Sequence, residues 1–118
     1  MSTSFKDKTD FQTRKNEANR IKTKYPTRIP VIVEMAKGCK NIAEITKHKY
    51  LVPKDLTIGQ LSYVIRKKIP ALDSHMGMFI FINKQMPSAG DIIGVVYENH
   101  VDDDGFLYVE YSGENTFG

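Results

Sequence analysis

The fold is decided by KYLVPKDLTIGQLSYVIRKKIP, residues 49–70. The run Tyr50–Val52 is rich in β-favouring residues, and Pro53 ends it as a strand. Thr57 then begins a helix with the pattern of a capping box, because Gln60 follows three residues later. The stretch therefore predicts a short strand, a turn and one well-defined helix.

The predicted helix has a single apolar stripe. Its members recur at helical spacing and are Ile58, Leu61, Ile65 and Ile69. Basic residues 66–68 suit the negative end of the helix dipole, and Pro70 prevents continuation. An amphipathic helix of this kind needs a sheet to pack on.

The N-terminal quarter predicts a surface helix. Residues 1–8 are polar apart from Phe5 and are expected to be loosely held. A second capping-box pattern at residues 9–12 begins a helix that runs to about Tyr25, where Pro26 ends it. Its apolar stripe is narrow and contains Phe11, Ala18, Ile21 and Tyr25. Such a helix lies on a finished surface rather than forming the centre of a core.

The remaining strands and turns follow from apolar runs and turn residues. Residues 29–33 and 78–82 are apolar in both alternation phases, so both faces of these strands should be covered. A short helix is expected over 88–99, an Asp-Gly turn at 102–105 and a last strand over 106–111. We expect a loop over 35–46.

This order of elements predicts an α+β fold of the ubiquitin-like β-grasp type. A four-stranded mixed sheet grips one central helix, and two additional N-terminal helices cover the other face of the sheet. We expect an N-terminal helical subdomain at 1–27, a β-grasp core at 28–111 and a C-terminal tail at 112–118.

The composition is that of one domain with an uneven charge distribution. The chain has 118 residues, a single cysteine and a net charge of +3. No apolar run approaches the ~20 residues that a membrane span needs, and a cytosolic location is expected. Residues 1–28 hold eight basic and three acidic residues, so a basic N-terminal face is predicted.

We find no pattern that predicts catalysis or metal binding. Cys39 has no accompanying His and Asn constellation, and His48, His75 and His100 lack metal-ligand spacing. Residues 102–104 lack the alternating ligands of a calcium loop, and no phosphate-binding loop is present. The sequence predicts a protein that is not an enzyme and that holds no metal or cofactor.

A basic binding module is the competing class of function. Its helix would present Arg14, Lys15, Arg20, Lys22 and Lys24. These could bind a microtubule or an anionic membrane, although an ordinary solvated helix face is the favoured interpretation of the charges by themselves. Aromatic residues do not interleave with the basic ones, so nucleic acid is not expected as a partner.

Several motifs together resemble the autophagy-related protein 8 family of ubiquitin-like modifiers. They are Lys24-Tyr25-Pro26-x-Arg28-x-Pro30-Val31-Ile32-Val33-Glu34, Lys49–Pro53 with Asp55-Leu56-Thr57, Gly105–Tyr108, and the terminal Phe117-Gly118. The resemblance covers the chain from Phe5 onward.

The resemblance implies a lipid-conjugated modifier. Activating and conjugating enzymes would join Gly118 to phosphatidylethanolamine, placing the chain on autophagosome membranes and cytoplasmic vesicles. Many family members carry residues after this glycine that a cysteine protease removes, and the sequence leaves open whether this chain is processed. The lipid would be a covalent attachment and not a cofactor. A frayed chain end is the ordinary interpretation of such a residue without the resemblance.

The resemblance also implies a docking site for cargo receptors and adaptors that carry aromatic-x-x-aliphatic motifs. The aromatic pocket would contain Glu17, Ile21, Pro30, Ile32, Lys49, Leu51 and Phe106. The aliphatic pocket would contain Tyr50, Val52, Pro53, Leu56, Leu61 and Val64. Acidic residues flanking the motif would meet Arg28, Lys47, Lys49 and Lys68.

Core packing is the competing interpretation of many of these apolar residues. For Leu61 and Val64, on or near the helix stripe, the two roles are evenly balanced. Phe79 and Phe81 share one strand face, which the family can use as a second docking surface, but a core or helix-covered role is favoured.

Overall fold

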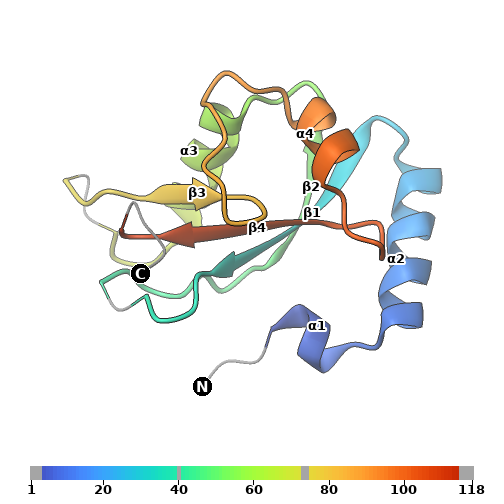
Figure 1. Cartoon of the computed structure of the whole chain (residues 1–118), viewed down its shortest axis with the longest axis horizontal. Coiled ribbons are helices and arrows are strands. Elements are labelled where there is room, and N and C mark those ends of the chain that lie inside the picture. The colour runs from blue at the N-terminus through green and yellow to red at the C-terminus, as the bar shows by residue number, and fades with distance from the viewer. Residues whose placement is uncertain (1–3, 40, 73–74, 115–118) are drawn as a thin grey trace.

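The computed structural model describes residues 4–39, 41–72 and 75–114. Its elements are α1 (Phe5–Lys8), α2 (Phe11–Lys24), β1 (Arg28–Met35), β2 (Lys49–Pro53), α3 (Ile58–Lys68), β3 (Phe79–Phe81), α4 (Ile93–His100) and β4 (Leu107–Ser112) (Figure 1). The sheet has the order β2-β1-β4-β3, with β1 and β4 parallel and the outer pairs antiparallel. The predicted four-stranded mixed sheet with two additional N-terminal helices is confirmed.

The central helix α3 begins as the sequence predicts. Thr57 Oγ1 accepts a hydrogen bond from the Gln60 backbone at 3.1 Å, and Gln60 Oε1 accepts one from the Thr57 backbone at 2.9 Å. All four residues of the apolar stripe are buried. They pack with α4 and with one face of the sheet, which includes Val31, Val33, Leu107 and Val109.

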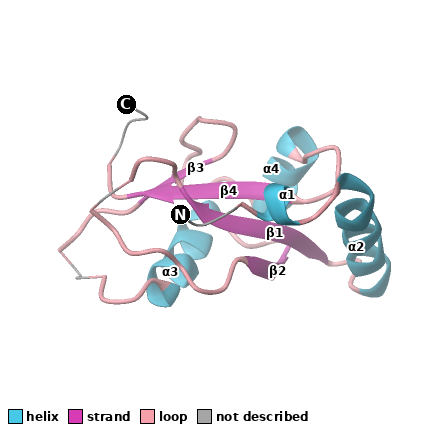
Figure 2. Ribbon diagram, turned by 90° about the horizontal axis from the view of Figure 1, so that it is seen from below, coloured by secondary structure: helices cyan, strands magenta, loops and turns pink. Residues whose placement is uncertain are grey.

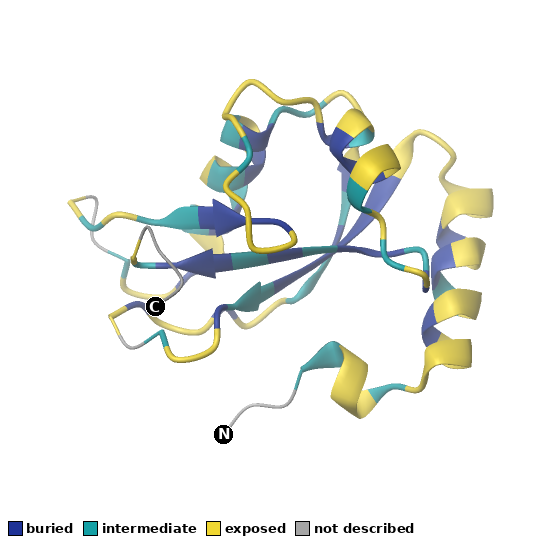
Figure 3. Cartoon of the chain, viewed as in Figure 1, coloured by how far each residue is buried: buried dark blue, intermediate teal, exposed yellow. Residues whose placement is uncertain are grey.

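A second, smaller core lies on the opposite face of the sheet. It contains Ala18 and Ile21 from α2, Ile32 from β1 and Phe106, which precedes β4. Figures 2 and 3 show α2 beside the sheet with its outer surface exposed. Two layers of helices therefore enclose the strands, as the apolar runs in both alternation phases predict.

Gly105 allows α2 to approach the sheet closely. Its φ of +95° lies in the region that favours glycine, and an added Cβ would lie 2.9 Å from Ala18 Cβ. The predicted Asp-Gly turn is present, with Gly105 N–H donating to the Asp102 carbonyl at 2.9 Å. The turn thus serves both chain reversal and helix packing.

The predicted stripe of α2 is wrong at its two ends. Phe11 and Tyr25 are 43% and 38% exposed, whereas Arg14 is buried. Arg14 Nε lies 2.8 Å from Asp104 Oδ2, and no periodicity of apolar residues could indicate this buried charge. Arg14 is therefore not part of the basic face on which the binding-module interpretation depends.

Three further local predictions need correction. Residues 5–8 form helix α1 instead of a loose segment, and Ser4 caps it. Asp10 caps α2 by accepting from the Thr13 backbone, so the predicted box with Gln12 is wrong. The helix expected over 88–99 begins only at Ile93, because the Asp91 N–H donates to the Ser88 carbonyl at 3.0 Å in a turn, and Ile92 then pairs with Thr57 at the start of α3.

No helix in the described part of the chain combines the length and the apolar content that a membrane crossing requires.

Candidate functional site

Strand β2 is an outer strand of the sheet, bonded to β1 on one side only. The Val33 N–H donates to the His48 carbonyl at 2.7 Å, and Val31 lies opposite Tyr50 in the register. Because the bonded and non-bonded pairs of an antiparallel ladder alternate, the backbone groups of Lys49 and Leu51 point away from β1. These groups form an edge to which an extended chain could add.

The two sides of β2 face different helices. Leu51 packs against the core under α2, whereas Tyr50 and Val52 belong to the core under α3. Successive side chains of a strand point to opposite faces, so the edge lies between two apolar surfaces. Residues 50–52 are all apolar, which suits a strand with apolar surfaces on both sides.

The residues predicted for the aromatic pocket converge on the α2 side of the edge. Ile21, Ile32 and Phe106 belong to the same small core, and Leu51 packs against it. Pro30 lies opposite Leu51, one residue before the β1–β4 ladder begins at Val31, so its missing N–H interrupts no residue pair of that ladder.

The floor of this site is already well packed. Ile21, Ile32 and Phe106 are 8%, 1% and 0% exposed. The ring of Phe5 from α1 meets the Phe106 ring edge-on, with centroids 5.4 Å apart. The side chain of Leu51 is half-buried. An incoming aromatic side chain would therefore need these residues to move or would rest on the surface that Leu51 presents.

An ion pair spans the rim of the aromatic side. Lys49 Nζ donates to Glu17 Oε2, joining β2 to α2. The same ammonium group lies 5.4 Å from the centroid of the Phe5 ring. Lys49 is thus engaged by its own chain, and a carboxylate on a partner would have to compete with Glu17.

The residues predicted for the aliphatic pocket divide into buried and accessible ones. Leu61, Tyr50 and Val52 are buried in the core under α3. Leu56 and Val64 are half-buried, and Pro53 is exposed. The accessible surface on this side therefore comes from Pro53, Leu56 and Val64, with the other three forming the layer beneath.

Tyr50 contains an unusual buried hydroxyl. The side chain is buried, and Oη has no hydrogen-bond partner among the described residues. Burial raises the pKa of this hydroxyl above its ordinary value. Lys47 Nζ lies 5.1 Å from the centroid of the Tyr50 ring, so the aromatic face is covered by a cation.

The basic residues expected to recognise acidic flanks do not form one cluster. Arg28 lies opposite Pro53 at one end of β2, and Lys47 precedes the other end. Arg28 Nη1 donates to the Leu51 carbonyl at 3.2 Å, so it covers one of the edge acceptors. Lys68 is exposed at the end of α3.

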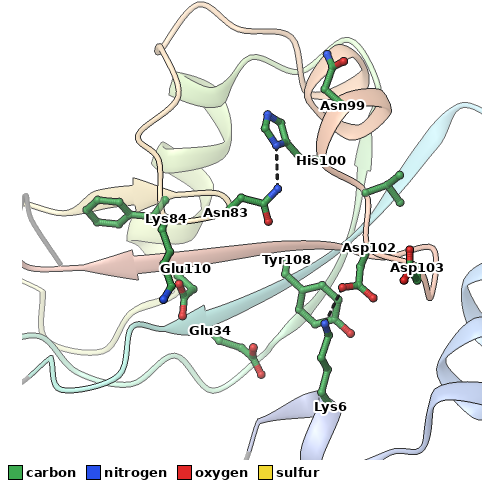
Figure 4. Close-up of a pocket in the computed structure, with 12 residues that line it drawn as sticks. Lys6, Glu34, Asn83, Lys84, Asn99, His100, Asp102, Asp103, Tyr108 and Glu110 are labelled. Carbon is green, nitrogen blue, oxygen red and sulfur yellow. Dashed lines mark hydrogen bonds and ion pairs between the residues drawn. The ribbon is translucent and has the colours of Figure 1, made fainter.

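A separate hollow of about 460 Å³ lies among α1, α4 and the sheet (Figure 4). Glu34 and Glu110 are paired there across β1 and β4. Burial is the main cause that raises the pKa of Glu110, and the negative charge of Glu34 is the second. Glu34 Oε2 accepts from the Phe5 backbone at 2.8 Å, and Lys6 pairs with Asp102 at 2.6 Å. Several charged groups of this hollow thus have partners within the chain. A site for an ionic ligand would instead present unpaired groups of one charge.

Within the described ranges, no three His, Cys, Asp or Glu side chains are grouped as a metal ion requires. The predicted conjugation residue, Gly118, lies outside the described residues.

The comparisons with known proteins decide the family. Residues 13–118 match the sequence model of a family described as "Autophagy protein Atg8 ubiquitin like". The chain belongs to the Atg8 family. The resemblance identified from the sequence motifs is therefore confirmed, and Atg8-family proteins are ubiquitin-like modifiers of autophagy and not enzymes.

Relatives of this Atg8-family chain match it over nearly its whole length. Autophagy-related protein 8e of Arabidopsis thaliana is 54% identical over 114 residues, covering 97% of this chain and 92% of the relative. Autophagy-related protein 8 of Mycosarcoma maydis is 52% identical over 118 residues, covering 100% and 98%. The solved structure of Plasmodium falciparum Atg8 in complex with an Atg3 peptide has a TM-score of 0.88 and 35% identity, covering 98% of this chain and 100% of that one.

Sequence reasoning missed how far this edge is tied to the rest of the Atg8 fold. The Lys49–Glu17 ion pair joins two side chains from separate elements, and the Arg28 side chain reaches the Leu51 carbonyl of another strand; neither contact has a local signal in the sequence. The opposite charges of Glu17 and Lys49 are compatible with pairing, but only the packing of α2 against the sheet brings them together.

Proposed function

We propose that this Atg8-family chain is conjugated through Gly118 to phosphatidylethanolamine on autophagosomal membranes, where it recruits cargo receptors and adaptors. The carboxylate would be activated with ATP and carried as a thioester on an enzyme cysteine. The lipid amine would then attack the carbonyl carbon, forming an amide as the thiolate leaves. Family membership supports this reaction, and a glycine without a Cβ suits both the enzyme channel and the attack.

Conjugation would give a chain of this composition a stable membrane attachment. Each buried methylene of an acyl chain contributes ~0.8 kcal/mol, and two chains are the usual threshold for stable anchoring. Phosphatidylethanolamine supplies two chains at once. We expect the chain to occupy the cytoplasm before conjugation, and autophagosome membranes and cytoplasmic vesicles after it.

The outward-facing edge of β2 is the observation that carries the recruitment role. An extended peptide could add to the backbone groups of Lys49 and Leu51, while its side chains meet apolar surfaces on both sides. An aromatic side chain buries ~150–250 Å², about 4–6 kcal/mol gross at ~25 cal/mol per Å². After the costs of association, this leads us to expect micromolar affinity.

The proposed enzymatic partners follow from the same family. The Plasmodium falciparum relative is in complex with a peptide of Atg3. We propose that this chain likewise engages a conjugating enzyme, together with an activating enzyme and a cysteine protease for processing or delipidation. The chain itself would hold no metal or cofactor for these steps.

The alternative is an unconjugated adaptor whose basic α2 binds microtubules or anionic membrane. Lys15, Arg20, Lys22 and Lys24 are exposed and remain available, but Arg14 is not, because it is buried against Asp104. Binding through the four remaining residues would weaken strongly with salt. Binding at the β2 edge would instead depend on apolar contacts.

Calorimetric titration with a peptide containing Trp-x-x-Leu and an acidic flank tests the recruitment role. Leu51→Ala should raise Kd about tenfold, which corresponds to about 1.4 kcal/mol. Val95→Ala is the matched control, because Val95 is an exposed aliphatic residue on α4. An unchanged Kd for Leu51→Ala would contradict the proposed site. If the wild type and Leu51→Ala had equal Kd values, and both values rose strongly with salt concentration, the basic helix would be favoured instead.

A further inference from the structure

The end of β4 is fastened to the loop that follows β1. Tyr111 is fully buried, and its hydroxyl donates to the Ala43 carbonyl at 2.8 Å. The same hydroxyl accepts from the Ile45 backbone at 2.6 Å. The Tyr111 carbonyl also accepts from the Ala36 backbone at 2.8 Å. The described parts of the loop, 36–39 and 41–46, therefore have a fixed relation to the end of β4.

These contacts continue to the root of the C-terminal tail. Gly113 N–H donates to Cys39 Sγ at 3.5 Å, and Asn41 Nδ2 donates to the Gly113 carbonyl at 3.4 Å. Ser112 Oγ donates to Cys39 Sγ at 3.7 Å, and Cys39 Sγ donates to Asn41 Oδ1 at 3.6 Å. We call the set Cys39, Asn41 and Gly113 the tail bracket.

Glycine at position 113 leaves room for the Asn41 amide in the tail bracket. A Cβ on Gly113 would lie 2.3 Å from Asn41 Oδ1 and 2.7 Å from Asn41 Cγ. Gly113 is not among the glycines with positive φ, so its backbone conformation is open to other residues. A larger residue here would therefore displace the Asn41 amide, the movable end of a flexible side chain.

We infer that the tail bracket positions the C-terminal tail for conjugation, an inference that rests on the proposed function. Gly118 is four residues beyond Glu114, and four fully extended residues span no more than about 14 Å. With so short a reach, the place and direction from which the tail starts determine which points the Gly118 carboxylate can occupy. Cys39, Asn41 and Gly113 are positioning residues in this sense and do not touch the reacting atoms.

Two different substitutions should release the bracket in the same way. In Gly113→Ala the new methyl group would force the Asn41 amide to rotate away, breaking its hydrogen bond to the Gly113 carbonyl. Asn41→Ala removes that hydrogen bond directly. Since both act on one contact, the double variant should be no more impaired than either single variant.

The test is conjugation by purified activating and conjugating enzymes with ATP and phosphatidylethanolamine vesicles. For each single variant we expect kcat for thioester transfer to fall roughly fivefold, because fewer bound molecules present the tail productively. KM should change little, because a positioning residue acts on the bound complex and not on the binding step. Gly90→Ala is the matched control, since nothing lies within 4 Å of its new Cβ.

Two further measurements separate positioning from loss of structure. Hydrogen exchange at the Gly113 amide should be faster in both single variants than in the wild type. The Kd of the motif peptide at β2 should be unchanged in all of them.

Equal kcat in Gly113→Ala and Gly90→Ala would overturn the inference. So would a double variant, Gly113→Ala with Asn41→Ala, whose fold-loss in kcat equals the product of the two single fold-losses. Absence of conjugation in the wild type, with the enzymes active on a control substrate, would instead overturn the proposed function on which the inference rests.

Discussion

Arg14 of α2 and Asp104 of the turn before β4 form a buried ion pair, with Nε 2.8 Å from Oδ2 and side chains 9% and 0% exposed. Asp104 also accepts from the Phe106 backbone at 2.8 Å and from the Tyr108 hydroxyl. Arg14 donates to the Thr9 carbonyl between α1 and α2. The pair therefore joins both N-terminal helices to the sheet.

Arg14→Ala should lower the free energy of unfolding by about 3–5 kcal/mol, because it leaves Asp104 buried without its cation. Arg20→Ala, at an exposed position of the same helix, should stay within about 0.5 kcal/mol of the wild type. Urea unfolding followed by circular dichroism measures both. A loss below 1 kcal/mol for Arg14→Ala would show that the pair contributes little.

Tyr50→Phe should leave stability unchanged or raise it by up to about 1 kcal/mol, because the buried hydroxyl has no partner among the described residues. Tyr50→Ala should lower stability by about 3–5 kcal/mol through loss of core packing. The same urea experiment distinguishes the two variants. If Tyr50→Phe were as damaging as Tyr50→Ala, the hydroxyl would need a partner that this structure does not show.

Glu110→Gln should raise Tm at pH 7, because burial and the facing Glu34 disfavour the charged carboxylate. The folded-state pKa of Glu110 is raised, so its charge destabilises the fold above that pKa and protonation removes the penalty as pH falls. The difference in Tm between variant and wild type should therefore shrink on acidification. Glu98→Gln, at an exposed site on α4, is the control, and a constant difference would refute this interpretation.

Tyr111→Phe should cost about 1–3 kcal/mol at pH 7, because it removes the hydroxyl that bonds Ile45 and Ala43. Burial raises the pKa of Tyr111 to about 12. The unfolded state would ionise first, so the stability that this hydroxyl supplies should decline as pH rises from about 10 towards about 12. Unfolding of wild type and variant at pH 8 and pH 11 would measure that decline. An equal difference at both values would contradict it.

Local patterns predicted the central part of the fold well. The capping box at Thr57 and Gln60 and the stripe of α3 depend on spacing along one segment, and the structure confirms both. The apolar run at residues 50–52 agrees with a strand between two apolar surfaces, whereas its outer position was expected from the family resemblance. Family motifs then indicated which residues to examine around that edge.

Contacts between distant segments could not be predicted in this way. Arg14 and Asp104 are 90 residues apart, and Asn41 and Gly113 are 72 apart. A charged residue on a helix usually faces solvent, so the burial of Arg14 has no signal in the apolar pattern. The non-helical backbone of residues 89–92 depends likewise on hydrogen bonds from the start of α3.

Conjugation of the chain ending at Gly118 is the measurement to make first. The wild type and Gly118→Ala would be incubated with the family's activating and conjugating enzymes, ATP and phosphatidylethanolamine vesicles, and then analysed by mass spectrometry. We expect the wild type to gain the mass of one lipid less one water, and Gly118→Ala to gain none. An unmodified wild type, with the enzymes active on a control substrate, would contradict the lipid-modifier role and leave a peptide-binding β-grasp adaptor.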